Sequence, residues 1–527
     1  MAQTKFENEL TFERFVAEGN EEEFHKGYES AYKKALGGLK NRYPNVINGE
    51  KKFSKEGEFP DICPYDTRMT VGIFQKGSRE DVVEAVKSSI DSLESWEQTT
   101  VEHRCSIFRD AADDISRRKY EFSAWLTLEN GKNRFEAIAE VDEAIDYLRY
   151  YPKVLQEHEG YVLKLDGPVP CNETRSVLRP LGVVGVISPF NFPIAITTGM
   201  VTGALITGNV VILKPPSDAP LMGYMLHESL LKNGIPPGVF HYAAGSGSTV
   251  GSEIVKNRGI SAIAFTGSRD IGMAIARTSV ENGKRPPILE MGGKNPTIVS
   301  DKADLDKAVE GVGRAAFGYS GQKCSATSRV IVNRAVADKF TKKLATWVES
   351  KRIGDPSEKA TFSGPVINQA AVDRFKEVIR EASKTGQILT GGHVLDDGAF
   401  GNGFFVEPTI VVHVASNHEL ALKELFLPIL IILTYRDLDE ALAIANKIEY
   451  GLTAGVFSDD AGEIQEFFSK IKAGVAYANR PQGATTGALV GSQSFVGWKS
   501  SGVTGKGAGG PYYLLQFLQE QSRTVCR

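Results

Sequence analysis

Cysteine is scarce in this chain: five cysteines are scattered over 527 residues, at positions 63, 105, 171, 324 and 526. Numbers this low and spacings this wide exclude the disulfide framework that holds many small secreted domains together. The odd count leaves at least one thiol unpaired, which suits a reducing cytosol. We expect one cysteine to be chemically active and the other four to fill space as small apolar side chains.

Metal-ligand spacings and an excess of basic charge are missing as well. The chain has no CxxC or HExxH sequence, and its nearest histidines, His413 and His418, are five residues apart, so no metal site is predicted. The 61 Lys and Arg residues are balanced by 65 Asp and Glu residues, and no basic block is available to neutralise nucleic-acid phosphates. The N-terminal sequence MAQTKFENELTFERF lacks the apolar segment of a secretory signal. We therefore expect a cytoplasmic protein with no nucleic-acid partner.

The one long apolar stretch, residues 181–213, is interrupted by Pro189, Asn191 and Pro193. The chain therefore lacks an uninterrupted apolar helix of ~20 residues, which a membrane span requires. The stretch instead predicts a strand over 181–188, a turn over 189–193, a helix over 194–208 and a strand over 209–214. Neither strand alternates apolar with polar residues, as is typical of a parallel sheet covered on both faces.

The same order of elements continues along the chain. Ser217 and Asp218 can cap a helix that Gly234 ends, and strands are predicted at 239–244 and 260–265. This order is typical of a doubly wound α/β fold. A second α/β series begins near residue 295, with strands near 296–300, 329–333 and 427–433. Outside both series, residues 21–40 predict a charged helix, and residues 160–179 predict a hairpin around a Gly-Pro turn.

Two glycine-rich turns each connect a predicted strand to a helix. The first, residues 243–251, has the spacing G-x-G-x-x-x-G, which is one residue longer than the dinucleotide fingerprint, and no acidic residue ends a strand ~20 residues later. Its alternative interpretation is a tight turn with no ligand. The second, Gly267–Gly272, can place backbone N–H groups near a phosphate. Together the turns favour nucleotide binding without selecting the nucleotide.

Three residues have side chains suited to chemistry at a carbonyl group. Cys324 lies among small residues in FGYSGQKCSATSRVIV, and the adjacent Lys323 favours the nucleophilic thiolate. Glu290 lies in the apolar, glycine-rich sequence ILEMGGKNP, where desolvation raises a carboxyl pKa toward that of a general base. Asn191 follows a predicted strand and offers an amide donor for an oxyanion. Each alone also has a structural interpretation, as a buried small side chain, a helix-cap carboxylate or a turn amide.

Taken together, these residues and their surroundings resemble the aldehyde dehydrogenase superfamily. Six motifs occur in the family's order: ISPFN (187–191), LKP (213–215), FTGSRDIG (265–272), LEMGGKNP (289–296), GQKCS (321–325) and KELF (423–426). The separation of Glu290 and Cys324, 324 − 290 = 34 residues, is also the family's. The resemblance implies that Cys324 attacks an aldehyde, that Asn191 holds the oxyanion, and that Glu290 activates the water that hydrolyses the resulting thioester.

The resemblance also implies a set of contacts to a nicotinamide cofactor. Lys214 and Glu424 match residues that bind its two riboses, and Gly267, Ser268 and Gly272 match the turn beside its pyrophosphate. The other predicted cofactor residues are Ile187, Ser188, Pro189, Phe190, Ser217 and Phe426. Strict NAD users often carry Glu at the position of Ser217, so we expect NAD with appreciable NADP use.

The C-terminal third narrows the substrate. The sequences TGALVGSQSF (486–495) and KGAGGPYYLLQFLQ (506–519) look like the branch that oxidises glutamate γ-semialdehyde, the open form of 1-pyrroline-5-carboxylate, in proline breakdown. An amino-acid aldehyde needs a receptor for its carboxylate and an anion for its ammonium group. The resemblance assigns the substrate contacts to Glu140, Lys323, Ser325, Gly487, Ala488 and Phe495.

Two alternatives stay open. The chain could oxidise another carboxylated semialdehyde that needs no ammonium partner, and a Glu140→Ala variant would distinguish the two substrates. It could also be a non-catalytic protein that retains the fold, which a Cys324→Ala variant would test. The predicted organisation is an N-terminal helical extension (1–45), an NAD-binding domain (46–158 and 180–289), an oligomerisation hairpin (159–179), a catalytic domain (290–500) and a C-terminal oligomerisation segment (501–527). We expect the hairpin, which has no core of its own, to make the protein a homo-oligomer.

Overall fold

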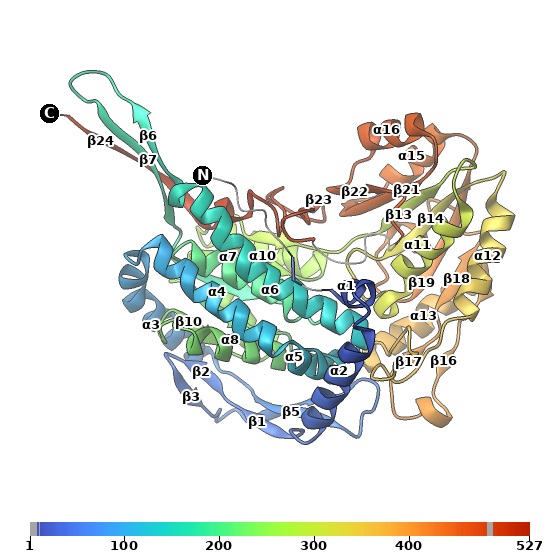
Figure 1. Ribbon diagram of the computed structural model, residues 1–527, viewed down its shortest axis with the longest axis horizontal. Helices are drawn as coiled ribbons and strands as arrows, with labels where there is room; N and C mark the ends of the chain where they lie inside the picture. Colours follow the sequence, from blue (N-terminus) through green and yellow to red (C-terminus); the bar gives the residue numbers. More distant parts are fainter. Residues whose placement is uncertain (1–7, 10, 482–488, 527) are drawn as a thin grey trace.

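The structure is a computed structural model that describes residues 8–9, 11–481 and 489–526. Two seven-stranded sheets, each packed against helices, form the two lobes of the molecule, and a three-stranded arm projects from one of them (Figure 1). The α/β class expected from the sequence, with a doubly wound parallel sheet, a second α/β domain and a hairpin arm, is confirmed.

The sheet of the first lobe has five parallel strands with an antiparallel pair at one edge. Its strands, in spatial order, are β12 (Ile288–Glu290), β11 (Ala262–Thr266), β8 (Val183–Ile187), β9 (Val210–Lys214), β10 (Phe240–Tyr242), β2 (Asn45–Ile47) and β3 (Glu50–Lys52). The centre of the sheet is apolar on both faces, and every residue of β9 is buried. The expectation of strands covered on both sides is therefore correct here.

Helices cover both faces of this sheet. They are α3 (Arg79–Glu97), α4 (Val101–Arg117), α5 (Lys119–Asn130), α6 (Arg134–Glu157), α7 (Ala195–Ile206), α8 (Leu221–Lys232), the π-helical turn η2 (Gly247–Gly251), α9 (Ser252–Lys256) and α10 (Arg269–Glu281). Local capping fixes where several of them begin. Ser78 and Asp81 form a capping box at the start of α3, and the Asn133 side chain accepts hydrogen bonds from two first-turn amides of α6.

The second lobe is built on a sheet whose strands are parallel except at one edge, where β15 is antiparallel. Its order is β15 (Gln387–Thr390), β18 (Thr409–Val412), β19 (Ile429–Tyr435), β14 (Thr327–Asn333), β13 (Asn295–Val299), β21 (Thr453–Phe457) and β22 (Val475–Ala478). Its helices are α11 (Leu305–Phe317), α12 (Ala337–Glu349), α13 (Gln369–Thr385), α14 (Glu419–Leu422), α15 (Leu438–Asn446) and α16 (Ala461–Lys470). The chain changes sheets between β12 and β13, whereas the predicted domain boundary falls between residues 289 and 290.

The arm consists of β6 (Val162–Asp166), β7 (Glu173–Pro180) and the C-terminal strand β24 (Leu518–Val525), all antiparallel. It lies away from both lobes in Figure 1. Cys171, in the turn between β6 and β7, forms a disulfide with Cys526 just beyond β24. The expectation that four cysteines only fill space is therefore wrong for these two. Cys63 and Cys105 are buried free thiols, as expected of small apolar side chains.

The N-terminal part contains two helices, α1 (Phe12–Ala17) and α2 (Glu21–Leu36), as well as a small sheet of β1 (Asn41–Tyr43), β5 (Thr70–Gln75) and β4 (Glu58–Ile62). The remaining short strands are β16 (Val394–Leu395), β17 (Phe405–Val406), β20 (Tyr450–Gly451) and β23 (Trp498–Lys499). Within the described residues, none of the helices combines the length and the hydropathy that crossing a bilayer requires.

Candidate active site

A strained turn presents Cys324 between the two lobes. Tyr319, Ser320 and Gly321, which follow α11, all have left-handed backbone conformations, with φ of 48°, 52° and 68°. A side chain at residue 321 would place its Cβ 2.3 Å from the Leu427 carbonyl oxygen, so the position requires glycine. The Tyr319 hydroxyl donates to the Asn130 carbonyl at 3.0 Å, and the Ser320 hydroxyl donates to the Gly364 carbonyl at 2.7 Å. Such fixed strain is typical of functional sites.

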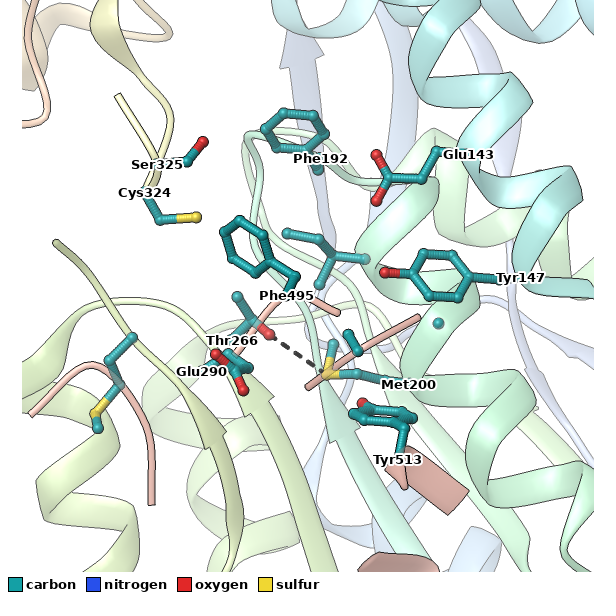
Figure 2. A pocket seen from close by; sticks show the side chains of 14 residues that line it. Glu143, Tyr147, Phe192, Met200, Thr266, Glu290, Cys324, Ser325, Phe495 and Tyr513 are labelled. Carbon is teal, nitrogen blue, oxygen red and sulfur yellow. Dashed lines mark hydrogen bonds between the residues drawn. The ribbon is translucent and has the colours of Figure 1, made fainter. Parts of the chain in front are cut away.

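Cys324 contributes to the walls of two separate pockets. The first is mainly apolar, and Figure 2 shows Cys324 and Glu290 on one side of it with Glu143 and Tyr147 of α6 opposite. The second pocket is a cleft that contains the ends of β8 and β11 and the segment that follows β12. Thr266 and Met291 also line both pockets. The Cys324 thiol thus lies where the two pockets meet.

Glu290 ends β12 and lines the first pocket. Its Oε2 atom is buried and has no hydrogen-bond partner among the described residues. Burial raises the pKa of this carboxyl well above its usual range, and a contact with the Gly497 backbone opposes the shift only weakly. The sequence predicted this environment, and it suits a general base for water.

The environment of the Cys324 thiol differs from the expectation. Burial raises the pKa of this thiol, and the nearby carboxylates Glu424 and Glu290 raise it further. The ammonium group of the adjacent Lys323 forms an ion pair with Glu136 at 2.9 Å. The raised pKa does not support the prediction that Lys323 favours the thiolate, and ionisation of the thiol needs a base or a bound cation.

Asn191 lies in the second pocket, in the loop between β8 and α7. Its side-chain amide is buried and donates to the Gln322 carbonyl at 3.0 Å. This bond orients the amide next to the Cys324 loop and leaves its second N–H for another acceptor. The geometry fits the predicted oxyanion donor.

Two of the predicted substrate residues line the first pocket, and two others lie outside the part of the chain that the structure describes. Ser325 and Phe495 line the first pocket with Cys324, whereas Gly487 and Ala488 lie outside the described residues. The rest of the lining was not predicted from the sequence; it includes Tyr147, Phe192, Met200 and Tyr513. Glu143 and Tyr147 are four residues apart, which places them on the same face of a helix. This spacing was the signal in the sequence for one wall of the first pocket.

Glu140 does not line the first pocket, and the assignment of the substrate's ammonium group to it is not supported. Its carboxylate is buried, forms an ion pair with the buried Lys132, and accepts hydrogen bonds from the Ile194 and Ala195 amides at the start of α7. Glu140 therefore holds α6 against α7. Glu143, three residues further along, is the α6 carboxylate that faces the pocket.

The cleft contains groups that fit a dinucleotide. Glu424 accepts a hydrogen bond from the Gly293 amide at 2.9 Å, and burial raises its pKa to about 7. The Ser188 hydroxyl is buried without a hydrogen-bond partner among the described residues, as expected of a group that awaits a ligand. Phe190 and Phe426 meet edge to face, with ring centroids 5.9 Å apart. Pro189, Gly267 and Ser268 complete the lining that the sequence predicted.

Four predicted cofactor residues lie outside this lining. Ile187 ends β8, and Lys214 is buried at the end of β9, where burial lowers its pKa to about 8. Gly272 packs inside α10, since a Cβ there would lie 2.5 Å from the Met291 sulfur. Ser217 lines a neighbouring hollow. The cleft also contains Arg374, which the sequence did not indicate.

A sequence profile described as "Aldehyde dehydrogenase family" matches residues 52–523. The chain belongs to the aldehyde dehydrogenase family. This assignment agrees with the thiol, carboxylate and amide that the two lobes bring together, and the resemblance seen in the six motifs is thereby confirmed.

Within the family, the chain is similar to enzymes of one kind. It is 38% identical over 524 residues to a 1-pyrroline-5-carboxylate dehydrogenase of Geobacillus thermodenitrificans, with 98% of each chain covered. A solved 1-pyrroline-5-carboxylate dehydrogenase from Thermus with bound NAD is 32% identical, with all of both chains covered and a TM-score of 0.92. Proline utilization A from Bdellovibrio bacteriovorus is 35% identical with a TM-score of 0.92, and this chain spans 53% of its length.

Proposed function

We propose that the chain oxidises glutamate γ-semialdehyde, the open form of 1-pyrroline-5-carboxylate, to glutamate with NAD as the oxidant. The observation that carries the proposal is the position of Cys324, which is exposed to an apolar pocket with carboxylates on one side and to a nucleotide-sized cleft on the other. The names of the similar enzymes support the substrate and the cofactor.

The first half of the reaction takes place on Cys324. Its sulfur, once deprotonated, attacks the aldehyde carbon, and the carbonyl oxygen becomes the oxyanion of a thiohemiacetal. The free N–H of Asn191 donates to this oxyanion, because the Gln322 carbonyl already holds the other N–H in place. Bound NAD supplies the acceptor for the hydride that leaves the same carbon, and a thioester remains on Cys324.

Glu290 carries out the second half. Its buried carboxylate takes a proton from water, whose oxygen attacks the thioester carbon. The tetrahedral intermediate collapses, the carbon–sulfur bond breaks, and the carboxylic acid product leaves. The raised pKa makes Glu290 a stronger base than an exposed carboxylate, at the cost of a smaller ionised fraction near neutral pH.

The cofactor would occupy the cleft between the lobes. Glu424 would accept from ribose hydroxyls, and the unpartnered Ser188 hydroxyl offers a further polar contact. The Gly267 amide donates to the Glu290 carbonyl at 3.1 Å. The Ser268 side chain makes no capping hydrogen bond to α10, so the first-turn amides of this helix can face a pyrophosphate.

The proposed ammonium partner of the substrate is Glu143. It lies across the pocket from Cys324, and its negative charge is close enough to contribute to the raised pKa of the thiol. A carboxylate in this apolar pocket favours an aldehyde that carries an ammonium group over a carboxylated aldehyde that has none.

We also propose that the protein is a homo-oligomer held by the arm, whose exposed side chains include Leu163, Leu165 and Val169. We further propose a cytoplasmic location.

The test is a panel of aldehydes followed by the absorbance of reduced cofactor. Glutamate γ-semialdehyde is expected to have the highest kcat/KM, and succinate semialdehyde a much lower one. A Glu143→Gln variant should raise KM for the amino-acid aldehyde by tenfold or more and leave succinate semialdehyde unaffected. Equal changes for both aldehydes would contradict the assignment of Glu143, and a higher kcat/KM for succinate semialdehyde in the wild type would contradict the proposed substrate.

A further inference from the structure

The segment before α1 is fixed on the first lobe through the carboxylate of Glu9. The side chain of Glu9 is 8% exposed, and its carboxylate accepts a hydrogen bond from the Ser116 hydroxyl at 3.0 Å. It also forms ion pairs with Lys119, at 3.3 Å, and with Arg149. These three partners belong to α4, α5 and α6. A shielded carboxylate with two cationic partners is held more strongly than a neutral hydrogen-bonded group, so the backbone at this position has a defined place.

Two amides of the same segment bind a single carboxylate of α6. The Asn8 side chain donates to Asp146 at 2.6 Å, and the Glu9 backbone amide donates to the other oxygen of that carboxylate at 2.7 Å. Asp146 is buried. It comes three residues after Glu143 and directly before Tyr147, both of which line the first pocket. The segment is therefore bound to the helix that forms one wall of this pocket.

The same side-chain nitrogen of Asn8 also reaches a segment near the other end of the chain. It donates to the carbonyl of the buried Val490 at 3.1 Å. The next residue, Gly491, donates its amide to the Gly509 carbonyl at 2.9 Å. Gly509 in turn donates its amide to the Tyr151 hydroxyl of α6 at 3.0 Å. Hydrogen bonds through Asn8 and through Tyr151 therefore both connect α6 with this C-terminal segment.

The C-terminal segment forms another wall of the first pocket. Phe495 and Ala508 exchange two backbone hydrogen bonds of 2.9 Å, and both residues line the pocket. Figure 2 shows Phe495 together with Glu143 and Tyr147 of α6 around this space. Asn8 itself does not line the pocket. It contacts the two elements that do, on the side away from the substrate.

We propose that Asn8 is a positioning residue for the substrate, whose side chain sets the spacing between the α6 wall and the Phe495 wall of the first pocket. An amide nitrogen carries two N–H donors, and its two acceptors here, Asp146 and Val490, belong to the two walls. The inference rests on the proposed function, in which the aldehyde fills this pocket and Glu143 binds its ammonium group. Small displacements of such a wall are costly to a substrate that must reach both Glu143 and the thiol.

The test is an Asn8→Ala variant, with Asn20→Ala as the matched control. Asn20 is an exposed asparagine that precedes α2 and makes no capping hydrogen bond to it. Asn8→Ala is expected to raise KM for glutamate γ-semialdehyde by about fivefold or more. KM for propionaldehyde, which has no ammonium group for Glu143, should change by less than about twofold. The control should change neither KM.

Affinity for NAD, measured by calorimetry, distinguishes positioning from a general loss of structure. Among the described residues, the cofactor cleft contains none from α6 or from the C-terminal segment. Asn8→Ala should therefore leave the Kd for NAD unchanged. Combined with Phe495→Leu, it should raise KM for the amino-acid aldehyde by less than the product of the two single effects, because both changes act on one wall.

An exchanged pair, Asn8→Asp with Asp146→Asn, isolates the contact with Val490. The exchange can keep an amide–carboxylate hydrogen bond between the segment and α6, but residue 8 then has no donor for the Val490 carbonyl. The raised KM of Asn8→Ala should therefore persist in the exchanged pair. A return to the wild-type KM would overturn the proposed link between the walls.

Three other results would also overturn the proposal. They are an unchanged KM in Asn8→Ala, an equal rise of KM for both aldehydes with weaker NAD binding, and full multiplicativity with Phe495→Leu. None of these affects the proposed function while the wild-type protein oxidises glutamate γ-semialdehyde with NAD. Absence of that activity in the wild type would instead refute the proposed function.

Discussion

Replacement of Glu290 by glutamine separates the two halves of the proposed reaction. The carboxylate that activates water is lost, while the side-chain volume is kept. The backbone of Glu290 pairs with β11 and with Gly502, so the strand does not depend on the side chain. A positioned general base contributes roughly 10²- to 10⁴-fold to a rate, which corresponds to about 2.7–5.5 kcal/mol of transition-state stabilisation. Steady-state kcat should fall by that factor.

Rapid mixing is the assay that distinguishes this mechanism from others. Formation of the thioester does not require Glu290 if another base ionises the thiol, so the variant should still release close to one reduced cofactor per site in a burst. Slow hydrolysis should follow. Cys324→Ala should abolish both phases, and Glu143→Gln should retain both.

The pH profile gives a second measure of Glu290. Its pKa is raised by burial, so the carboxylate is ionised only above that raised value, and deacylation in the wild type should accelerate as pH rises through it. The Glu290→Gln variant should lose this rise. Loss of the burst in the variant would show that Glu290 is needed for thioester formation, as the base for Cys324, and would refute its assignment to hydrolysis alone. Unchanged turnover would exclude Glu290 as a base altogether.

Three further predictions concern other parts of the molecule. Glu140→Ala should lower the free energy of unfolding by about 3–5 kcal/mol, since it removes the ion-pair partner of the buried Lys132 ammonium. An unchanged denaturant midpoint with a raised KM would instead restore Glu140 to the substrate site. Affinity for NAD should weaken as pH falls from 8 to 6, because Glu424, with a pKa of about 7, becomes protonated. The affinity of the Glu424→Gln variant for NAD should not change over this pH range. A pH dependence that persists in the variant would remove Glu424 from the ribose site. In oxidised protein a non-reducing peptide map should contain a linked Cys171–Cys526 pair. Amide hydrogen exchange of the C-terminal strand should be slower in oxidised than in reduced protein. Equal exchange rates would mean that the disulfide does not stabilise the arm.

Local sequence was enough to predict much of the framework. The strands expected at 181–188 and 209–214 are β8 (183–187) and β9 (210–214), and the helix expected at 194–208 is α7 (195–206). These elements follow one another closely, and prolines, glycines and a change in apolar pattern mark their ends. Glu290 ends β12, Asn191 lies in the loop after β8, and Cys324 lies between α11 and β14, so all three candidate residues are close to the ends of such elements.

Contacts between distant segments were not predictable in the same way. Cys171 and Cys526 are 355 residues apart, and no spacing rule connects them. Lys323 is next to Cys324 in sequence, yet its ammonium group binds Glu136 on another element. Glu140 and Glu143 are three residues apart on one helix, and the packing of α6 against α7 decides which of them faces the first pocket. In each case the missing information is tertiary packing.

The position of Cys324 between two pockets bears on the order in which substrate and cofactor can enter and leave the site. In the proposed reaction the aldehyde would occupy one pocket and the cofactor the other, with Cys324 in the wall of both, so neither would have to leave before the other could move. The cleft could therefore empty of reduced cofactor while the acyl group is still attached to Cys324. The thioester would hold the acyl group in the first pocket while reduced cofactor in the cleft is exchanged for NAD.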